Sequence, residues 1–72
     1  MKSKTILAKI VWKDLELGFW GLIDQSGKEY LPMNLPTSLE KDGEEVRLEI
    51  EEHPDAMTMV MWGTPVRIVN VL

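Results

Sequence analysis

The chain has 72 residues, a net charge of −4 and no cysteine. A chain this short forms one domain with a small core, and the lack of cysteine excludes disulfides and thiolate metal sites. The negative charge disfavours contact with phosphate backbones, so a nucleic-acid partner is not expected from charge. No run of about 18 apolar residues and no signal-peptide pattern is present, so we expect no membrane contact and, by default, a cytoplasmic location.

The first half of the chain predicts three β-strands. Residues 5–12 are rich in β-branched and aromatic side chains, which is typical of a strand. The predicted inner face of this strand comprises Ile6, Ala8, Ile10 and Trp12. Residues 18–24 and 28–32 predict a hairpin, in which Asp24 caps the turn and Gly27 supplies the positive φ that closes it.

A short helix and a charged strand are expected next. Pro36 can begin one or two helical turns, with Leu39 facing inward and residues 42–43 ending the helix. Apolar and charged residues alternate over 44–52, which is the clearest strand pattern in the chain. One face of this strand should therefore belong to the core and the other should face water.

The last third predicts a strand that bends. After a turn at 53–56, residues 57–62 are apolar on both faces and are interpreted as a strand, which resumes over 66–71. The glycine and proline between these two runs provide the kink that a barrel needs in order to close. This interpretation places Trp62 in the core, as alternation does for Trp12.

The order of these elements indicates the fold. Residues 1–72 form a single all-β domain with three strands, a short helix and two further strands, the order expected of a small five-stranded OB-like barrel. An SH3-like barrel is the alternative, but its short helical turn lies near the end of the chain.

Four segments together resemble a group of small bacterial and archaeal β-barrel proteins for which no activity is assigned. The segments span residues 18–24, 27–36, 41–46 and 61–66, and the resemblance covers roughly residues 17–71. Glycines, prolines and aromatic residues carry it. The resemblance therefore implies a barrel fold and assigns no catalytic or binding residue.

Catalytic chemistry finds little support in the sequence. His53 is the only histidine and lies in an acidic predicted turn, where a single imidazole seldom makes a defined metal site. The serines lie in loop-like context, which excludes a Ser-His-Asp set, and no phosphate-binding loop is present. We expect a protein that is not an enzyme and that needs neither a metal nor a cofactor.

The aromatic residues suggest one kind of binding site. Trp20 and Tyr30 lie on neighbouring strands of the predicted hairpin, where both rings could be exposed, with Lys9 and Lys28 as nearby cations. OB barrels use aromatic rings on the sheet face to stack bases or sugars. Single-stranded nucleic acid or an oligosaccharide is therefore an alternative ligand.

The methionines suggest another kind of site, which we favour because of the negative charge. Met57, Met59 and Met61 form a stripe at alternate positions. Methionine adapts to irregular surfaces and is frequent at protein contacts, whereas a buried stripe would fill gaps in the core. We expect a non-enzymatic binding module with a protein partner, which could be a second copy of the chain.

Overall fold

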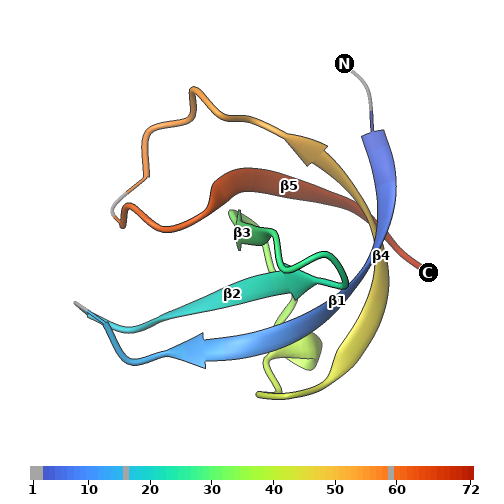
Figure 1. The fold of residues 1–72 in the computed structure, drawn as a ribbon, viewed down its shortest axis with the longest axis horizontal. Coiled ribbons are helices and arrows are strands. Elements are labelled where there is room, and N and C mark those ends of the chain that lie inside the picture. Colours follow the sequence, from blue (N-terminus) through green and yellow to red (C-terminus); the bar gives the residue numbers. More distant parts are fainter. Residues whose placement is uncertain (1–2, 16, 59) are drawn as a thin grey trace.

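The computed structural model describes residues 3–15, 17–58 and 60–72 of the chain. Within these residues five strands close into a barrel (Figure 1): β1 (Ser3–Lys13), β2 (Phe19–Asp24), β3 (Glu29–Pro32), β4 (Glu45–Glu52) and β5 (Thr64–Val71). A single 3₁₀ turn, η1 (Thr37–Leu39), lies between β3 and β4, and no helix in the described residues is long and apolar enough to cross a membrane. The predicted five-stranded barrel with a short helix after its third strand is confirmed.

β1 closes the barrel. Around the barrel the strands follow the order β1-β2-β3-β5-β4, with β3 and β5 parallel and the other neighbours antiparallel. Residues 3–9 of β1 pair with β4, and residues 8–13 pair with β2. Because only residues 8 and 9 pair on both sides, the last residues of β1 run with β2 beyond the part of the barrel that β4 encloses.

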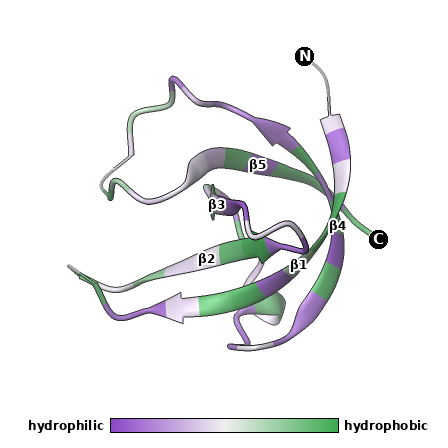
Figure 2. Ribbon diagram, in the orientation of Figure 1, coloured by the Kyte–Doolittle hydropathy of each residue, from purple (hydrophilic) through white to green (hydrophobic). Residues whose placement is uncertain are grey.

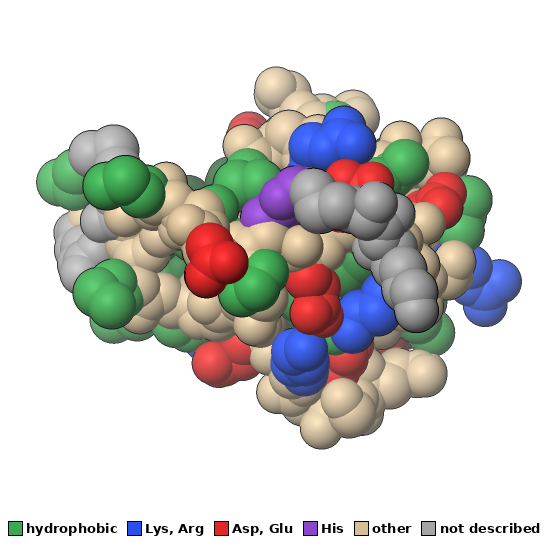
Figure 3. Space-filling view, turned by 90° about the horizontal axis from the view of Figure 1, so that it is seen from above, with side chains coloured by type: hydrophobic (Ala, Val, Ile, Leu, Met, Phe, Trp, Pro, Cys, Tyr) green, Lys and Arg blue, Asp and Glu red, His purple; other side chains and the backbone are tan. Residues whose placement is uncertain are grey.

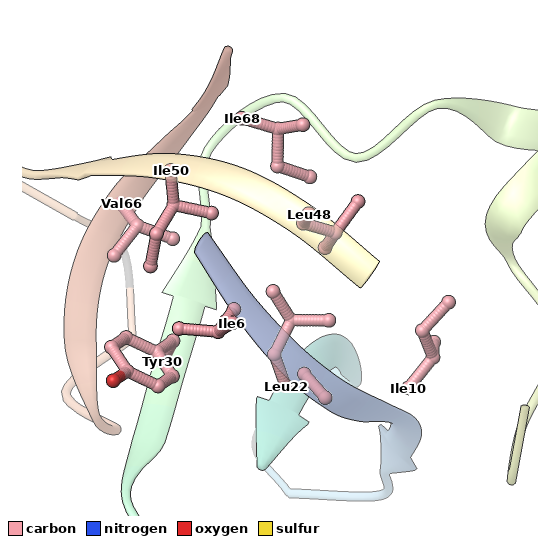
Figure 4. Close-up of a cluster of buried hydrophobic side chains, with 9 residues drawn as sticks. Ile6, Ile10, Leu22, Tyr30, Leu48, Ile50, Val66 and Ile68 are labelled. Atoms are coloured by element: carbon pink, nitrogen blue, oxygen red, sulfur yellow. The ribbon is translucent and has the colours of Figure 1, made fainter. Parts of the chain in front are cut away.

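Hydrophilic and hydrophobic residues alternate along β4 (Figure 2). The core consists of alternate strand residues whose side chains point into the barrel (Figure 4). Its buried members are Ile6, Ala8, Ile10, Leu22, Tyr30, Leu48, Ile50, Val66 and Ile68. Leu39 of η1 packs against this cluster, as predicted. The prediction for Trp12 is wrong, since its side chain is 46% exposed: pairing between β1 and β4 ends at Lys9, so the ring lies past the enclosed part of the barrel.

The prediction of a strand over residues 57–62 is also wrong. The described part of this segment belongs to the loop between β4 and β5. That loop begins with a turn in which the Ala56 N–H donates to the His53 carbonyl at 2.9 Å. Both neighbours of β5 explain the difference. The pairing of β5 with β3 begins at Thr64 and its pairing with β4 ends at Val66, so the residues before Thr64 have no strand beside them, whatever their β propensity.

Side-chain amide groups continue the barrel where β3 ends. The Ile68 N–H donates to Asn34 Oδ1 at 2.7 Å, and Asn34 Nδ2 donates to the Ile68 carbonyl at 3.0 Å. The amide of Asn34 thus offers β5 the same donor and acceptor as a strand backbone would. At the end of β1 a carboxylate supplies an acceptor instead, since Asp42 Oδ1 accepts the Trp12 N–H at 2.7 Å.

We predict that Asn34→Ala lowers the free energy of unfolding by about 1–3 kcal/mol, because a buried N–H and carbonyl of β5 lose their partners. Urea unfolding followed by circular dichroism measures the change. Asn70→Ala is the matched control, since the Asn70 amide reaches only the exposed Glu49 carboxylate and its removal should change stability by at most about 0.5 kcal/mol. Equal losses in the two variants would show that Asn34 does not complete the barrel.

Candidate functional site

The aromatic site predicted from the hairpin is not assembled. Tyr30 is 0% exposed and lies opposite Leu22 on the inner face of the sheet, so the prediction that its ring is exposed is wrong. Trp20 lies two residues before Leu22 and also packs against the core. Both rings point into the barrel because the alternation of β2 and β3 places them on the same face as Leu22.

The two predicted cations lie apart from each other. Lys9 lies exposed on the outer face of β1, opposite Ile23 of β2. Lys28 lies at the hairpin turn, where its Nζ contacts Glu52 Oε2 at 2.9 Å. Trp20, Tyr30, Lys9 and Lys28 therefore form no common surface.

Lys28 instead belongs to a cluster of charged side chains, with Lys4 and Glu52, that lies over the Tyr30 ring. Lys4 and Lys28 both contact Glu52 Oε2 at 2.9 Å, and each ammonium lies 5.2 Å from the centre of the Tyr30 ring. The hydrogen bond from Lys4 is the main reason that the pKa of Glu52 lies below its usual value. These partly exposed charges shield one side of the core, and the ammonium groups of Lys4 and Lys28 are both paired with Glu52.

Asp24 stabilises the turn of the β2–β3 hairpin and also binds the Tyr30 hydroxyl. Its Oδ1 accepts the Ser26 hydroxyl at 2.7 Å and the N–H groups of Ser26 and Lys28 at 2.9 and 3.0 Å, while its Oδ2 accepts the Tyr30 hydroxyl at 2.9 Å. The Ser26 hydroxyl is the main cause of a lowered pKa of Asp24, about 2, and Tyr30 adds to it. The predicted capping of the turn by Asp24, and the positive φ of Gly27, are confirmed.

The end of β1 and the start of β2 form a two-stranded ribbon that extends past β4, and an aromatic pair covers each face of this β1–β2 ribbon. On the inner face Trp12 and Trp20 lie opposite each other, with ring centres 5.1 Å apart and an edge-to-face orientation. On the outer face Phe19 packs against Trp62 from the β4–β5 loop, with ring centres 5.5 Å apart. Lys13 Nζ lies 5.5 Å from the centre of the Trp62 ring. Trp62 is thus only half-buried, on the outside of the barrel rather than in its core.

Two glycines make room for these tryptophans. A Cβ atom at Gly18 would lie 2.6 Å from the Trp12 ring, and one at Gly21 would overlap the Trp62 ring. The pattern of glycine, two aromatic residues and glycine over 18–21 therefore seats one tryptophan on each face of the ribbon. This arrangement fixes the β4–β5 loop against the β1–β2 ribbon.

The β1–β2 and β4–β5 loops lie at the same end of the molecule (Figure 1) and carry exposed apolar side chains. Hydrophobic side chains are visible at this end in the space-filling view (Figure 3). Leu17 is 88% exposed, Met57 100% and Met61 98%. We call this surface the apolar end and define it as Leu15, Leu17, Phe19, Met57, Val60, Met61 and Trp62. A notch of about 60 Å³ opens in it between the loops, lined by Leu15, Phe19, Val60, Met61 and Trp62.

The sequence identified only part of this surface. Met57 and Met61 were predicted as interface residues and lie here, whereas Met59 lies outside the described residues. Leu15, Leu17 and Phe19 were missed, because nothing local indicates that the two loops meet. The glycines at 18 and 21 were the available signal, since they mark positions that neighbouring rings approach closely.

No protein-family model matches the chain, and no curated protein or solved structure is significantly similar to it. The resemblance of its glycine, proline and aromatic pattern to a group of small β-barrel proteins therefore stays a prediction.

We predict that Gly21→Ala lowers the free energy of unfolding by about 1–3 kcal/mol, because the new methyl group overlaps the Trp62 ring. In a Trp62→Ala background the same change should cost less than about 0.5 kcal/mol, since the obstacle is gone. Urea unfolding of the four proteins measures the interaction. An equal cost in both backgrounds would show that Trp62 does not lie over Gly21.

We predict that Asp24→Asn removes a pH-dependent part of the stability. The pKa of Asp24 is lowered in the folded state. The ionised carboxylate therefore stabilises the fold at pH values above the ordinary pKa of an aspartate, and this stabilisation is lost as the pH falls towards about 2. The difference in unfolding free energy between wild type and variant should be largest above about pH 4 and should shrink towards pH 2. A difference independent of pH over this range, measured by urea unfolding, would contradict the depressed pKa.

Proposed function

We propose that this protein is a non-enzymatic binding module and that the apolar end is the surface that contacts a protein partner. The observation that carries the proposal is the nearly complete exposure of Leu17, Met57 and Met61 in the two loops that border one apolar notch, which Met61 itself lines. Exposed apolar area costs about 25 cal/mol per Å², and contiguous apolar patches on soluble domains often mark contact sites. A partner that covers these side chains would recover this free energy.

The chemistry of the surface favours protein over nucleic acid. The notch is lined by apolar side chains, and two of them, Phe19 and Trp62, are aromatic. Its size suits the tip of one apolar or aromatic anchor residue, the kind of residue that dominates protein interfaces. The net charge of −4 opposes binding of a phosphate backbone.

The fold supports the choice of this end. We propose that the barrel is of the OB type, on the basis of its strand order and of the short turn between β3 and β4. Barrels of that type bind ligands with the loops between strands 1 and 2 and between strands 4 and 5. These are the loops that form the apolar end here. A cytoplasmic location, and independence of any cofactor, are part of the proposal.

A second candidate is stacking of single-stranded nucleic acid or of an oligosaccharide. One observation favours it: Phe19 and Trp62 form an aromatic pair on the outer face, with the Lys13 ammonium beside it. These residues would replace Trp20 and Tyr30 as the stacking rings, because Tyr30 is buried.

Peptide selection tests the proposed function. We expect a phage-displayed library of random peptides, selected on the immobilised protein, to yield peptides with apolar or aromatic anchors. In amide NMR spectra such a peptide should shift residues of both loops. The variant Leu17→Ser/Met61→Gln should bind it at least about tenfold more weakly, whereas Leu72→Ser, an exposed apolar residue at the C-terminus, should bind it normally.

The alternatives give different results in the same spectra. Shifts at the apolar end that grow with protein concentration alone would identify a second copy as the partner. Shifts of Lys13 and Trp62 caused by a mixed-sequence oligonucleotide would favour the stacking function. Peptides that bind wild type and the double variant equally would contradict the apolar end as the binding surface.

A further inference from the structure

We propose that Met57 and Met61 are sites of reversible sulfur oxidation and that their oxidation to sulfoxide switches off the apolar end. The regulatory part of this inference rests on the proposed function, because it concerns the same surface. The modification sites themselves follow from the exposure and the chemistry of the two side chains.

Methionine carries all of the sulfur in this protein. The chain has five methionines and no cysteine, so an oxidant that attacks sulfur meets only thioethers. Reactivity towards such oxidants increases with exposure. Met57 is 100% exposed and Met61 98%, whereas Met33, in the segment after β3, is 45% exposed. The two most accessible methionines among the described residues thus lie in the same loop.

The reaction needs a peroxide as oxidant. A lone pair of the thioether sulfur attacks one oxygen of hydrogen peroxide, an S–O bond forms, the O–O bond breaks and water leaves after proton transfer. The sulfur is oxidised by two electrons, and the peroxide is reduced to water. Thiol-dependent methionine sulfoxide reductases reverse the change, and each acts on one of the two sulfoxide epimers.

Oxidation at these positions changes the surface without disturbing the barrel. Met61 lines the notch beside Phe19 and Trp62, so a sulfoxide there introduces a strong dipole into an apolar binding site. Met57 lies in the same loop. The buried core of the described residues consists of other residue types, so the fold does not depend on either thioether.

The first test measures oxidation rates on the intact protein. Wild-type protein is treated with dilute hydrogen peroxide, and peptide mapping by mass spectrometry follows each methionine. We expect Met57 and Met61 to be oxidised at least about threefold faster than Met33, which is the internal control. Rates at or below that of Met33 would overturn the assignment of these sites.

The second test measures the surface without any partner. Fluorescence of the uncharged dye Nile red should fall by about half or more when wild type is oxidised, and recombinant sulfoxide reductases should restore it. Met57→Leu/Met61→Leu keeps the apolar surface but cannot be oxidised there, so its dye signal should survive peroxide. Circular dichroism should be the same before and after treatment. A loss of signal that is equal in wild type and in the leucine variant would overturn the switch.

The regulatory part has its own readout. Peptides selected on the unoxidised protein should lose at least about tenfold in affinity for oxidised wild type and keep their affinity for the oxidised leucine variant. Unchanged peptide binding after oxidation at both sites would overturn the regulation while the proposed function stands. Failure to select any peptide would count against the proposed function, and the rates and the dye signal would still decide the oxidation sites.

Discussion

The pairing of β1 with two different strands is the constraint on which the rest of the structure depends. Ala8 and Lys9 pair with both β2 and β4, whereas the residues before them pair only with β4. Ile10 still exchanges backbone hydrogen bonds with Gly43 and Glu44, just before β4, and the residues after it pair only with β2. This sharing closes the barrel, which removes exposed strand edges. It also sends the end of the β1–β2 ribbon past β4, where the core covers its side chains only in part, as the packing of Trp20 and the exposure of Trp12 show.

The apolar end follows from this geometry. A ribbon outside the barrel has two faces that need cover, and the chain supplies one aromatic pair for each face, Trp12 with Trp20 and Phe19 with Trp62. Trp62 comes from a different loop, so covering the ribbon also draws the β4–β5 loop against it. Among the described residues of these loops, Leu17, Met57 and Met61 remain almost completely exposed. This surplus is the physical basis for proposing a binding surface here.

The short β3 is the second determinant. It has four residues and pairs with β2 at only two positions before it turns to β5. The side-chain amide of Asn34 then continues the contact with β5, and Asp24 holds the hairpin that leads into β3. Polar side chains thus complete a barrel whose third strand is too short to do so. The described residues before Thr64 remain a loop for the same reason, since β3 offers them no partner.

The sequence by itself determined the features that depend on neighbouring residues in the chain, namely strand alternation, turns and their capping. The alternation at Leu48 and Ile50, the capped turn at Asp24 and the helical turn near Pro36 were sufficient for the order of elements and for the closed barrel. Alternation separates two faces of a strand but does not say where its neighbours end. The tertiary structure alone therefore decided the exposure of Trp12, the burial of Tyr30, the loop before Thr64 and the meeting of Leu15 and Phe19 with Met61 at one notch. Each of these features depends on residues distant in the chain.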